Sequence, residues 1–453
     1  ARLPVRIRVV SHPRPASEVV ARSLPVKFQL QMSRWRAAVD AYVPPAAETG
    51  GRLVSLDVAR GMAVAMMLFV EQLRGSGFPS LRHAAWVGLT WADIVFPCFM
   101  FLAGCSLAVV TLRVPETGNL IAMFVRRALN LFAVGLVFNA FSGGGADLST
   151  LRIPGVLQRI GVCLLAALLV VLLCRRLPVG RSESARSGLA SSQPGRSVSG
   201  GSVLWVGLVA LVLLVAYGQW LVRSGLGCGS PVTARCNAAG ALDRRLLPVA
   251  HLYRGADFPG YDPEGVASSV AAVVTVLAGW VAMRCALARQ ASVRWWLLAL
   301  PAAAALWAAS WVGPLTAGIG SIKRLWSPVF TLRTAAIALV VLALCRPLDG
   351  LQRRAAAVGH RAVCPLAALG RHALTIYVGQ HLIGTALDRT TIDGRSLADR
   401  MAGHFAGFGS EGRYLAFAIA CTIVATAAAL TLDALDRTAK RRRQPSGRQP
   451  GHG

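Results

Sequence analysis

The sequence predicts an all-α, polytopic membrane protein, and three observations lead to this prediction. First, 55% of the residues are hydrophobic and only 15% are charged, which is far from the balance of a soluble domain. Second, the apolar residues form runs that approach the roughly 20 residues needed to cross a bilayer. Third, these runs lack the alternation of strands, and open sheet edges cannot lie in lipid, so helices are the expected spanning elements.

Ten spans are expected, which together make a bundle of about ten transmembrane helices. A chain of 453 residues would suit about three soluble domains, but these runs indicate one membrane domain without a fixed-period repeat. The expected spans are Leu53–Leu73, Trp91–Leu112, Met123–Phe141, Gly155–Cys174, Val203–Val222, Val266–Arg284, Trp295–Val312, Leu325–Cys345, Cys364–Leu387 and Tyr414–Leu435.

The remaining segments suggest tails and loops around this domain. We expect residues 1–50 to form a basic, mobile cytoplasmic tail, because they lack the apolar core of a cleavable signal peptide. Residues 51–436 form the transmembrane domain, and residues 437–453 form a second basic, disordered tail. Within the domain, loop 175–202 is rich in Ser, Gly and Arg and is expected to be flexible on the inside. Loop 223–264 is the largest outside loop.

The net charge of +28 suggests a nucleic-acid partner, but the distribution of the charge argues against one. When the segments alternate from a cytoplasmic N-terminus, the inside segments carry about twice as many basic residues as the outside loops. This positive-inside pattern predicts a multi-pass protein of the cell membrane with both termini cytoplasmic. Basic segments beside the spans also suit an anionic inner leaflet, so membrane lipid is an expected partner.

Most of the ten cysteines are expected to be buried apolar residues, because eight fall in or beside spans. Cys228 and Cys236 lie in the large outside loop and would form a disulfide if that loop faces an oxidising space. A free pair remains equally open at this point. No CxxC pair or histidine-rich stretch supports a metal site.

Unusual polar residues precede or open the second, fourth, sixth and eighth spans. Under the alternating topology, all four clusters lie on one face of the membrane. Helix N-termini there present free N–H groups and partial positive charge, which favour anions or developing oxyanions. Ordinary helix capping is the alternative for the sixth span. The clusters are His83 with Asp93, Gln158 with Arg159, Asp262 with Glu264, and Lys323 with Arg324.

His83 and Asp93 form the strongest of these clusters. A titratable group at the mouth of a membrane helix is a functional-site hypothesis by default, although a single loop histidine is more often simply solvated. Histidine is suited to proton transfer near neutral pH. We therefore interpret His83 as a general base and Asp93 as the group that orients it. Arg159 and Lys323 are candidates for stabilising negative charge.

Two further polar features lie on spans. Asp57 and Arg60 share one face near the inside end of the first span, where they form a pair or Arg60 extends to the interface. Contact of Arg60 with a cytoplasmic anion is the functional alternative. His381, in the ninth span, is a secondary candidate for proton transfer, and a hydrogen-bonded core histidine is the structural alternative.

The motifs themselves resemble the family of heparan-alpha-glucosaminide N-acetyltransferases and its bacterial relatives. The resemblance covers about residues 50–436, and the blocks together are highly specific. They are RLVSLDVARGMAV at 52–64, HAAWVGLTWADIVFPCFMFLAGCS at 83–106, GVLQRIGVC at 155–163, YDPEGVASSVAAVVTVLAGW at 261–280, IKRLWSP at 322–328 and LGRHALTIYVGQHL at 369–382.

This resemblance implies a transmembrane acyltransferase. Members transfer acetyl from cytoplasmic acetyl-CoA to a sugar amine across the membrane, and their essential histidine corresponds to His83. Related enzymes form dimers, so a homodimer is implied here. Relatives usually carry Val-Asn where this chain has Val70-Glu71-Gln72, which leaves the acceptor open. The implied acceptor site, for a small molecule or glycan, consists of Gln72, Gln158, Glu264 and Lys323.

Coenzyme A carries several phosphates, which arginine binds through paired hydrogen bonds. Candidates on the inside are Arg60 and the pairs Arg126–Arg127 and Arg175–Arg176, and Arg159 is counted with them; positive-inside topology alone is the alternative. Acetyl-CoA would be the only cofactor, with no metal. Because the polar motifs lie outside and acetyl-CoA lies inside, the thioester arm has to reach through the bundle.

Other functions remain open from sequence. An O-acyltransferase acting on a cell-envelope glycan or glycolipid would share this mechanism and differ in its acceptor. A transporter without acyl chemistry would also place polar residues at helix ends. If acyl transfer occurs, His83 acts either as a base in direct transfer or as a nucleophile that forms an acetyl-histidine.

Overall fold

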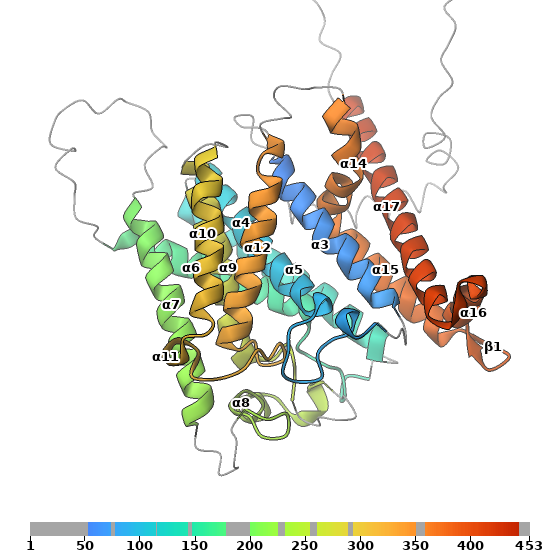
Figure 1. The fold of residues 1–453 in the computed structure, drawn as a ribbon, viewed down its shortest axis with the longest axis horizontal. Helices are drawn as coiled ribbons and strands as arrows, with labels where there is room; N and C mark the ends of the chain where they lie inside the picture. Colours follow the sequence, from blue (N-terminus) through green and yellow to red (C-terminus); the bar gives the residue numbers. More distant parts are fainter. Residues whose placement is uncertain are drawn as a thin grey trace, which may run out of the picture.

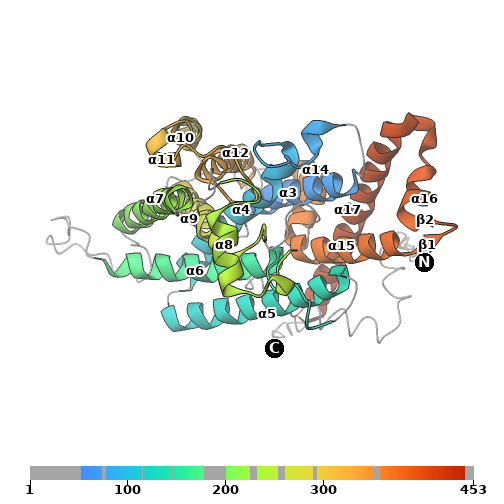
Figure 2. The same ribbon diagram turned by 90° about the horizontal axis from the view of Figure 1, so that it is seen from below.

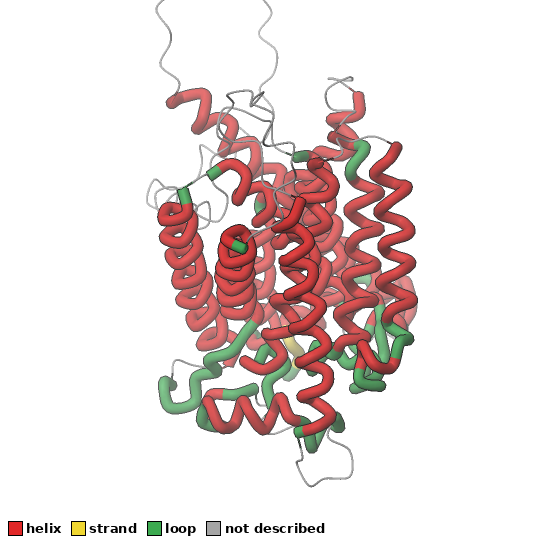
Figure 3. Tube along the Cα trace, turned by 90° about the vertical axis from the view of Figure 1, so that its left-hand side faces the viewer, coloured by secondary structure: helices red, strands yellow, loops and turns green. Residues whose placement is uncertain are grey.

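The computed structural model describes residues 53–73, 78–114, 116–143, 147–177, 200–224, 232–253, 261–288, 293–349 and 358–443. In this part of the chain nearly every element is a helix (Figures 1 and 3). The long helices are α3 (Val54–Gln72), α4 (Trp91–Arg113), α5 (Thr117–Gly143), α6 (Val156–Arg176), α7 (Gly200–Arg223), α9 (Val266–Ala288), α10 (Val293–Ala309), α12 (Pro328–Cys345), α14 (Val358–Arg371), α15 (Ala373–Arg389) and α17 (Gly409–Arg443).

Short elements connect these helices. The helical ones are η1 (Pro79–Leu81), α8 (Ala238–Leu246), η3 (Val249–His251), α11 (Gly313–Thr316), α16 (Leu397–Gly403) and η4 (Ala406–Phe408). Strands β1 (Thr391–Ile392) and β2 (Arg395–Ser396) pair antiparallel, with Thr391 opposite Ser396.

Seven described helices are long and apolar enough to cross a membrane: α4, α5, α6, α7, α9, α12 and α17. The predicted all-α polytopic class is therefore confirmed. Two further predicted spans are also helical. Helix α10 has 17 residues, and α3 carries Asp57, Arg60 and Glu71 within its 19 residues.

The ninth predicted span, Cys364–Leu387, is wrong as a continuous helix. The chain breaks at His372, between α14 and α15. At this point Arg371 forms an ion pair with Asp433 of α17, and Gly370 packs so closely on α3 that an added Cβ would lie 1.8 Å from the Asp57 carbonyl oxygen. Helix α17 also continues to Arg443, beyond the predicted domain end at 436. The predicted tail 1–50 and most of loop 175–202 lie outside the described residues.

Helices α4 and α9 form the centre of the core. Gly104 of α4 and Gly279 of α9 face each other's backbones: an added Cβ would lie 1.9 Å from the carbonyl oxygen of Val276 or Phe101, respectively. Only glycine allows this approach. Because the backbones of α4 and α9 pack directly against each other here, a ligand that extends along α4 has to follow the other face of α4, toward α3, α5 and α6.

Four long helices begin at the same end of the bundle, as the alternating topology predicts. The Lys323 ammonium, before α12, lies 3.2 Å from Asp93 Oδ1 in the first turn of α4. Arg159, in the first turn of α6, donates to the Pro263 carbonyl before α9 and lies 5.1 Å from the Trp326 ring centroid. Helix α8 and the connecting loops cover this end (Figures 1 and 2). We call it the His83 end.

The opposite end is where α4 stops. Its last residue, Arg113, lies about 30 Å from Asp93 along the axis, at 1.5 Å per residue. We call it the Arg113 end. It also holds the first turns of α3 and the end of α6, so the two ends carry different sets of charged residues.

Candidate functional site

The loop that carries His83 is fixed by contacts with distant segments. Gly88 has a φ of 148°, a conformation that side chains with a Cβ rarely adopt, and its N–H donates to the Ser321 carbonyl at 2.8 Å. The Trp86 indole donates to the Val232 carbonyl at 2.9 Å, and its ring packs edge-on against Tyr261. The loop is therefore held between the segment before α12 and the segment before α8.

His83, Asp93 and Lys323 meet at the start of α4. His83 Nδ1 lies 2.9 Å from Asp93 Oδ1 and 3.0 Å from the Lys323 ammonium. The Asp93 side chain is fully buried, whereas 57% of the His83 side chain is exposed. The imidazole thus contacts a buried carboxylate through Nδ1, and its other edge is accessible. A group that exchanges protons with a bound molecule needs such access.

The second oxygen of Asp93 holds the carboxylate in place. Asp93 Oδ2 accepts from the Thr90 hydroxyl at 2.9 Å, the Thr90 N–H at 3.2 Å and the Ala84 N–H at 3.1 Å. Capping of α4 and orientation of His83 are therefore two roles of one side chain. His83 Nδ1 contacts the Asp93 carboxylate, which only accepts hydrogen bonds, and the Lys323 ammonium, which only donates them, so Nδ1 bonds to one of the two at a time. With the proton on Nδ1, His83 donates to Asp93, and the ammonium pairs with Asp93 Oδ1 instead. Nε2 is then free to accept a proton.

Lys323 adds positive charge beside this pair. Burial lowers the pKa of Lys323, and the neighbouring Asp93 carboxylate opposes that effect. A lysine ammonium carries donors and no acceptor, so it can stabilise an oxyanion that develops next to His83. Three residues predicted from two motifs are thus brought into one cluster, which we call the His83 cluster.

Arg159 occupies a different environment from the predicted phosphate ligands. It is buried, donates to the carbonyls of Pro263 and Gly265 at 2.8 and 3.2 Å, and hydrogen-bonds the Ser268 hydroxyl. Its guanidinium therefore ties the start of α6 to the start of α9. The prediction that it shares a phosphate site with Arg60 and Arg127 is not met by this geometry.

Glu264 belongs to an ion-pair network that centres on Arg152. Arg152 binds Asp262 in a bidentate manner, at 2.9 and 2.6 Å, and also pairs with Glu264. These partners raise the pKa of Arg152 against the effect of burial. Arg152 was not among the residues predicted from the sequence, although it stands three residues before the Gly155 block. Glu264 faces an arginine in this structure, so it does not present a free carboxylate to an acceptor.

The two glutamines of the predicted acceptor site are both buried. Gln72 lies at the end of α3, where its amide nitrogen is 3.8 Å from a Cβ built on Gly384 of α15. Both polar atoms of the Gln158 amide are buried without a hydrogen-bond partner. The amide packs against Gly135 of α5, where an added Cβ would lie 2.3 Å from Gln158 Oε1.

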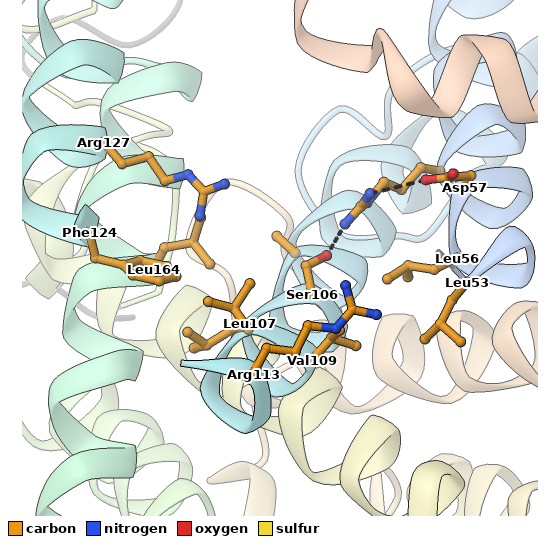
Figure 4. Close-up of a pocket in the computed structure, with 13 residues that line it drawn as sticks. Leu53, Leu56, Asp57, Ser106, Leu107, Val109, Arg113, Phe124, Arg127 and Leu164 are labelled. Atoms are coloured by element: carbon orange, nitrogen blue, oxygen red, sulfur yellow. Dashed lines mark hydrogen bonds and ion pairs between the residues drawn. The ribbon is translucent and has the colours of Figure 1, made fainter. Parts of the chain in front are cut away.

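A cationic pocket lies toward the Arg113 end, between α3, α4, α5 and α6 (Figure 4). Its volume is about 680 Å³, which includes space open to solvent. Arg60, Arg113 and Arg127 line it among leucine and valine side chains. Arg60 pairs with Asp57 at 3.6 Å and hydrogen-bonds Ser106. Arg113, which was not among the predicted phosphate ligands, also lines this pocket.

Arg126 and Arg127, predicted as a pair, point in different directions. Arg127 is buried at 8% exposure and lines the pocket, whereas Arg126 is exposed. The physical reason is that adjacent residues on a helix lie about 100° apart. Arg126 is therefore outside the pocket that its neighbour lines.

Cys236 is disulfide-bonded; the predicted partner, Cys228, falls outside the described residues. Seven other described cysteines are not in disulfides, and five of them are buried. Among the described residues, no group of three or more His, Cys, Asp or Glu is placed to hold a metal ion.

Comparison with known proteins confirms the resemblance drawn from the motifs. Residues 52–181 match the family described as heparan-alpha-glucosaminide N-acetyltransferase, catalytic. The human heparan-alpha-glucosaminide N-acetyltransferase is 29% identical over 289 residues, which cover 57% of this chain and 41% of that protein. The mouse protein of the same name is 28% identical over 261 residues, 51% of this chain and 38% of that protein. The chain thus matches about two fifths of each relative's length.

Proposed function

We propose that this relative of the heparan-alpha-glucosaminide N-acetyltransferases is a membrane-embedded acyltransferase that moves acetyl from acetyl-CoA to a glucosamine-type amine. The His83 cluster is the observation that supports this proposal most directly. It combines an accessible imidazole, a buried carboxylate that orients it and an ammonium at 3.0 Å. Acyl transfer needs these three parts: a base, its orienting group and a donor for the oxyanion.

In the proposed reaction, His83 Nε2 takes a proton from the acceptor amine while the amine nitrogen attacks the thioester carbonyl. The Lys323 ammonium stabilises the oxyanion of the tetrahedral intermediate. When this intermediate collapses, the C–S bond breaks and the imidazolium returns its proton to the leaving thiolate. An acetyl-histidine route would use the same nitrogen as nucleophile.

The pocket lined by Arg60, Arg113 and Arg127 supports acetyl-CoA as the donor. Arginine clusters suit phosphate groups, and the apolar lining suits the pantetheine arm. On α4 the pocket extends from Ala103 to Arg113, which places it about 15 to 30 Å along the helix from Asp93. An extended pantetheine arm spans a gap of this order, so the thioester would reach the His83 cluster while the nucleotide stays in the pocket.

Glu71 favours an amine over a hydroxyl as the acceptor. Its side chain hydrogen-bonds Gln380 of α15 and lies within electrostatic reach of Lys323. Among the described residues, no basic side chain forms an ion pair with Glu71. A carboxylate without an ion-pair partner at the His83 end suits an acceptor that arrives as an ammonium and loses one proton before it attacks. This observation ranks the N-acyltransferase above the O-acyltransferase.

The disulfide at Cys236 supports an extracytoplasmic His83 end. Disulfides persist in oxidising spaces outside the cytoplasm, and Val232, four residues before Cys236, accepts the hydrogen bond from Trp86 in the His83 loop. The basic Arg113 end would then face the cytoplasm, where acetyl-CoA is made.

Cysteine labelling tests this orientation. Val87 is 64% exposed beside His83, and Gly118 at the start of α5 has no atom within 4 Å of an added Cβ. In intact cells, we expect a membrane-impermeant maleimide to label Val87→Cys, and to label Gly118→Cys only after permeabilisation. The parent protein, in which most described cysteines outside disulfides are buried, serves as the background control. The reverse pattern would place His83 in the cytoplasm and contradict the proposed orientation.

The proposed reaction is tested with the purified full chain in liposomes. Acetyl-CoA labelled in its acetyl group is supplied, with glucosamine or N-acetylglucosamine as the acceptor. We expect label in N-acetylglucosamine from the first acceptor and little from the second, whose amine is blocked. Comparable labelling of both sugars would favour O-acylation. Uptake of glucosamine into the liposomes without acetyl-CoA and without acetylation would favour a transporter.

A further inference from the structure

A second pair of arginines, Arg175 and Arg284, lies at the Arg113 end, and both side chains are held by contacts around Thr111 of α4. Arg175, at the end of α6, donates to the Thr111 carbonyl of α4 at 2.9 Å. The Trp280 indole of α9 donates to the Thr111 hydroxyl at 3.2 Å, and the Arg284 guanidinium lies 5.7 Å from the Trp280 ring centroid. Contacts among α4, α6 and α9 thus hold Arg175 and Arg284 at the Arg113 end of the bundle, on the α9 side of α4.

The charge of this pair is not matched by the protein. Arg284 lies within electrostatic reach of Arg175, and among the described residues neither has a carboxylate within ion-pair distance. The Nε atoms of both side chains are buried without a hydrogen-bond partner. Two guanidinium groups held together without a counter-ion are electrostatically unfavourable unless an anion binds between them.

The position of Arg175 on α6 argues against a lipid headgroup as that anion. Arg175 continues the buried face formed by Leu168, Val171 and Leu172. The lipid-facing side is instead marked by exposed leucines, Leu169 and Leu173, and that side leads to Arg176, which is exposed. Helical spacing therefore directs Arg176 to the membrane surface and Arg175 into the bundle.

We propose that Arg175 and Arg284 bind the ribose 3′-phosphate of the acyl donor and so select coenzyme A over its dephosphorylated form. This inference rests on the proposed function, because it assumes that the nucleotide occupies the donor pocket. A phosphate monoester carries close to two negative charges near neutral pH, which matches two guanidinium groups. Arg60, Arg113 and Arg127 would then bind the diphosphate of coenzyme A. In this arrangement the 3′-phosphate and the diphosphate each have arginine ligands.

The test is a binding measurement that does not depend on turnover. Calorimetry on the full chain in phosphatidylcholine nanodiscs gives the Kd of CoA and of dephospho-CoA for the wild type, Arg175→Gln, Arg284→Gln and the matched control Arg176→Gln. We expect the wild type to prefer CoA by about tenfold, the value of one hydrogen bond to a charged group. Both variants should lose most of this preference through weaker CoA binding alone, while Arg176→Gln keeps it.

Each alternative outcome is distinct. Equal loss of affinity for both ligands, or a preference that survives both substitutions, would overturn the assignment. If phosphatidylglycerol in the nanodiscs competes at this pair while the preference for CoA persists in the variants, the site serves a lipid and the proposal is wrong. Selective CoA binding without acetyl transfer would support this inference and contradict the proposed function. Acetyl transfer without selectivity for CoA would support the proposed function and contradict this inference.

Discussion

Substitution of His83 by alanine should lower kcat for acetyl transfer by about 10²- to 10⁴-fold, the usual contribution of a general base. The reason is that Nε2 is the free nitrogen once Asp93 holds the proton on Nδ1. The measurement is steady-state transfer of labelled acetyl to glucosamine. Because the His83 side chain is 57% exposed, the thermal stability and the affinity for acetyl-CoA should change little.

Arg82→Ala is the matched control for this variant. Arg82 is the exposed neighbour of His83 in the same loop, so its removal tests whether any change in the loop impairs transfer. We expect its kcat to stay within about twofold of the wild type, since exposed substitutions rarely alter a site. Normal turnover in His83→Ala, or an equal loss in Arg82→Ala, would remove His83 from the mechanism.

Substitution of Arg127 by glutamine should raise the KM for acetyl-CoA by about 10- to 100-fold, because the loss of one hydrogen bond to a charged phosphate costs about 1.5–3 kcal/mol. Arg127 is buried and lines the donor pocket. Initial rates at varied acetyl-CoA give KM, and kcat at saturation should change much less, since the His83 cluster is intact.

The preceding residue provides the control. Arg126→Gln removes the same charge from the same helix, but its side chain is exposed and outside the pocket, so KM should stay within about twofold. Arg127→Lys separates charge from geometry, because lysine keeps the charge and loses the paired donors of arginine. If Arg126→Gln and Arg127→Gln raise KM equally, the effect is general electrostatics and the pocket does not bind the nucleotide.

The class of the fold and the ends of most helices could be predicted from the sequence because hydrophobic length and capping residues are local properties. Thr90 with Asp93, and Ser327 before Pro328, mark the starts of α4 and α12 in the chain itself. The break at His372 could not be found in this way. It coincides with contacts to α3 and α17, which lie far away in the sequence.

Part of the candidate site could be predicted because its residues are marked by local motifs. His83 and Asp93 stand ten residues apart in one motif, and alternation of the spans was enough to place Lys323 at the same end of the bundle. The roles of Arg159 and Glu264 were not predictable, since each is occupied by a partner about 100 residues away. Arg113 and Arg284 had no local signal, because basic residues end many membrane helices for topological reasons.

What this sequence determined by itself is a helical membrane protein with an ionisable cluster at one end and arginines at the other, because apolar length and charge bias act along the chain. Only the tertiary structure decided which arginines lie together and which charges remain unmatched by protein. Adjacent residues such as Arg126 and Arg127, or Arg175 and Arg176, diverge by about 100° on a helix, and the packing of neighbouring helices then covers one and exposes the other.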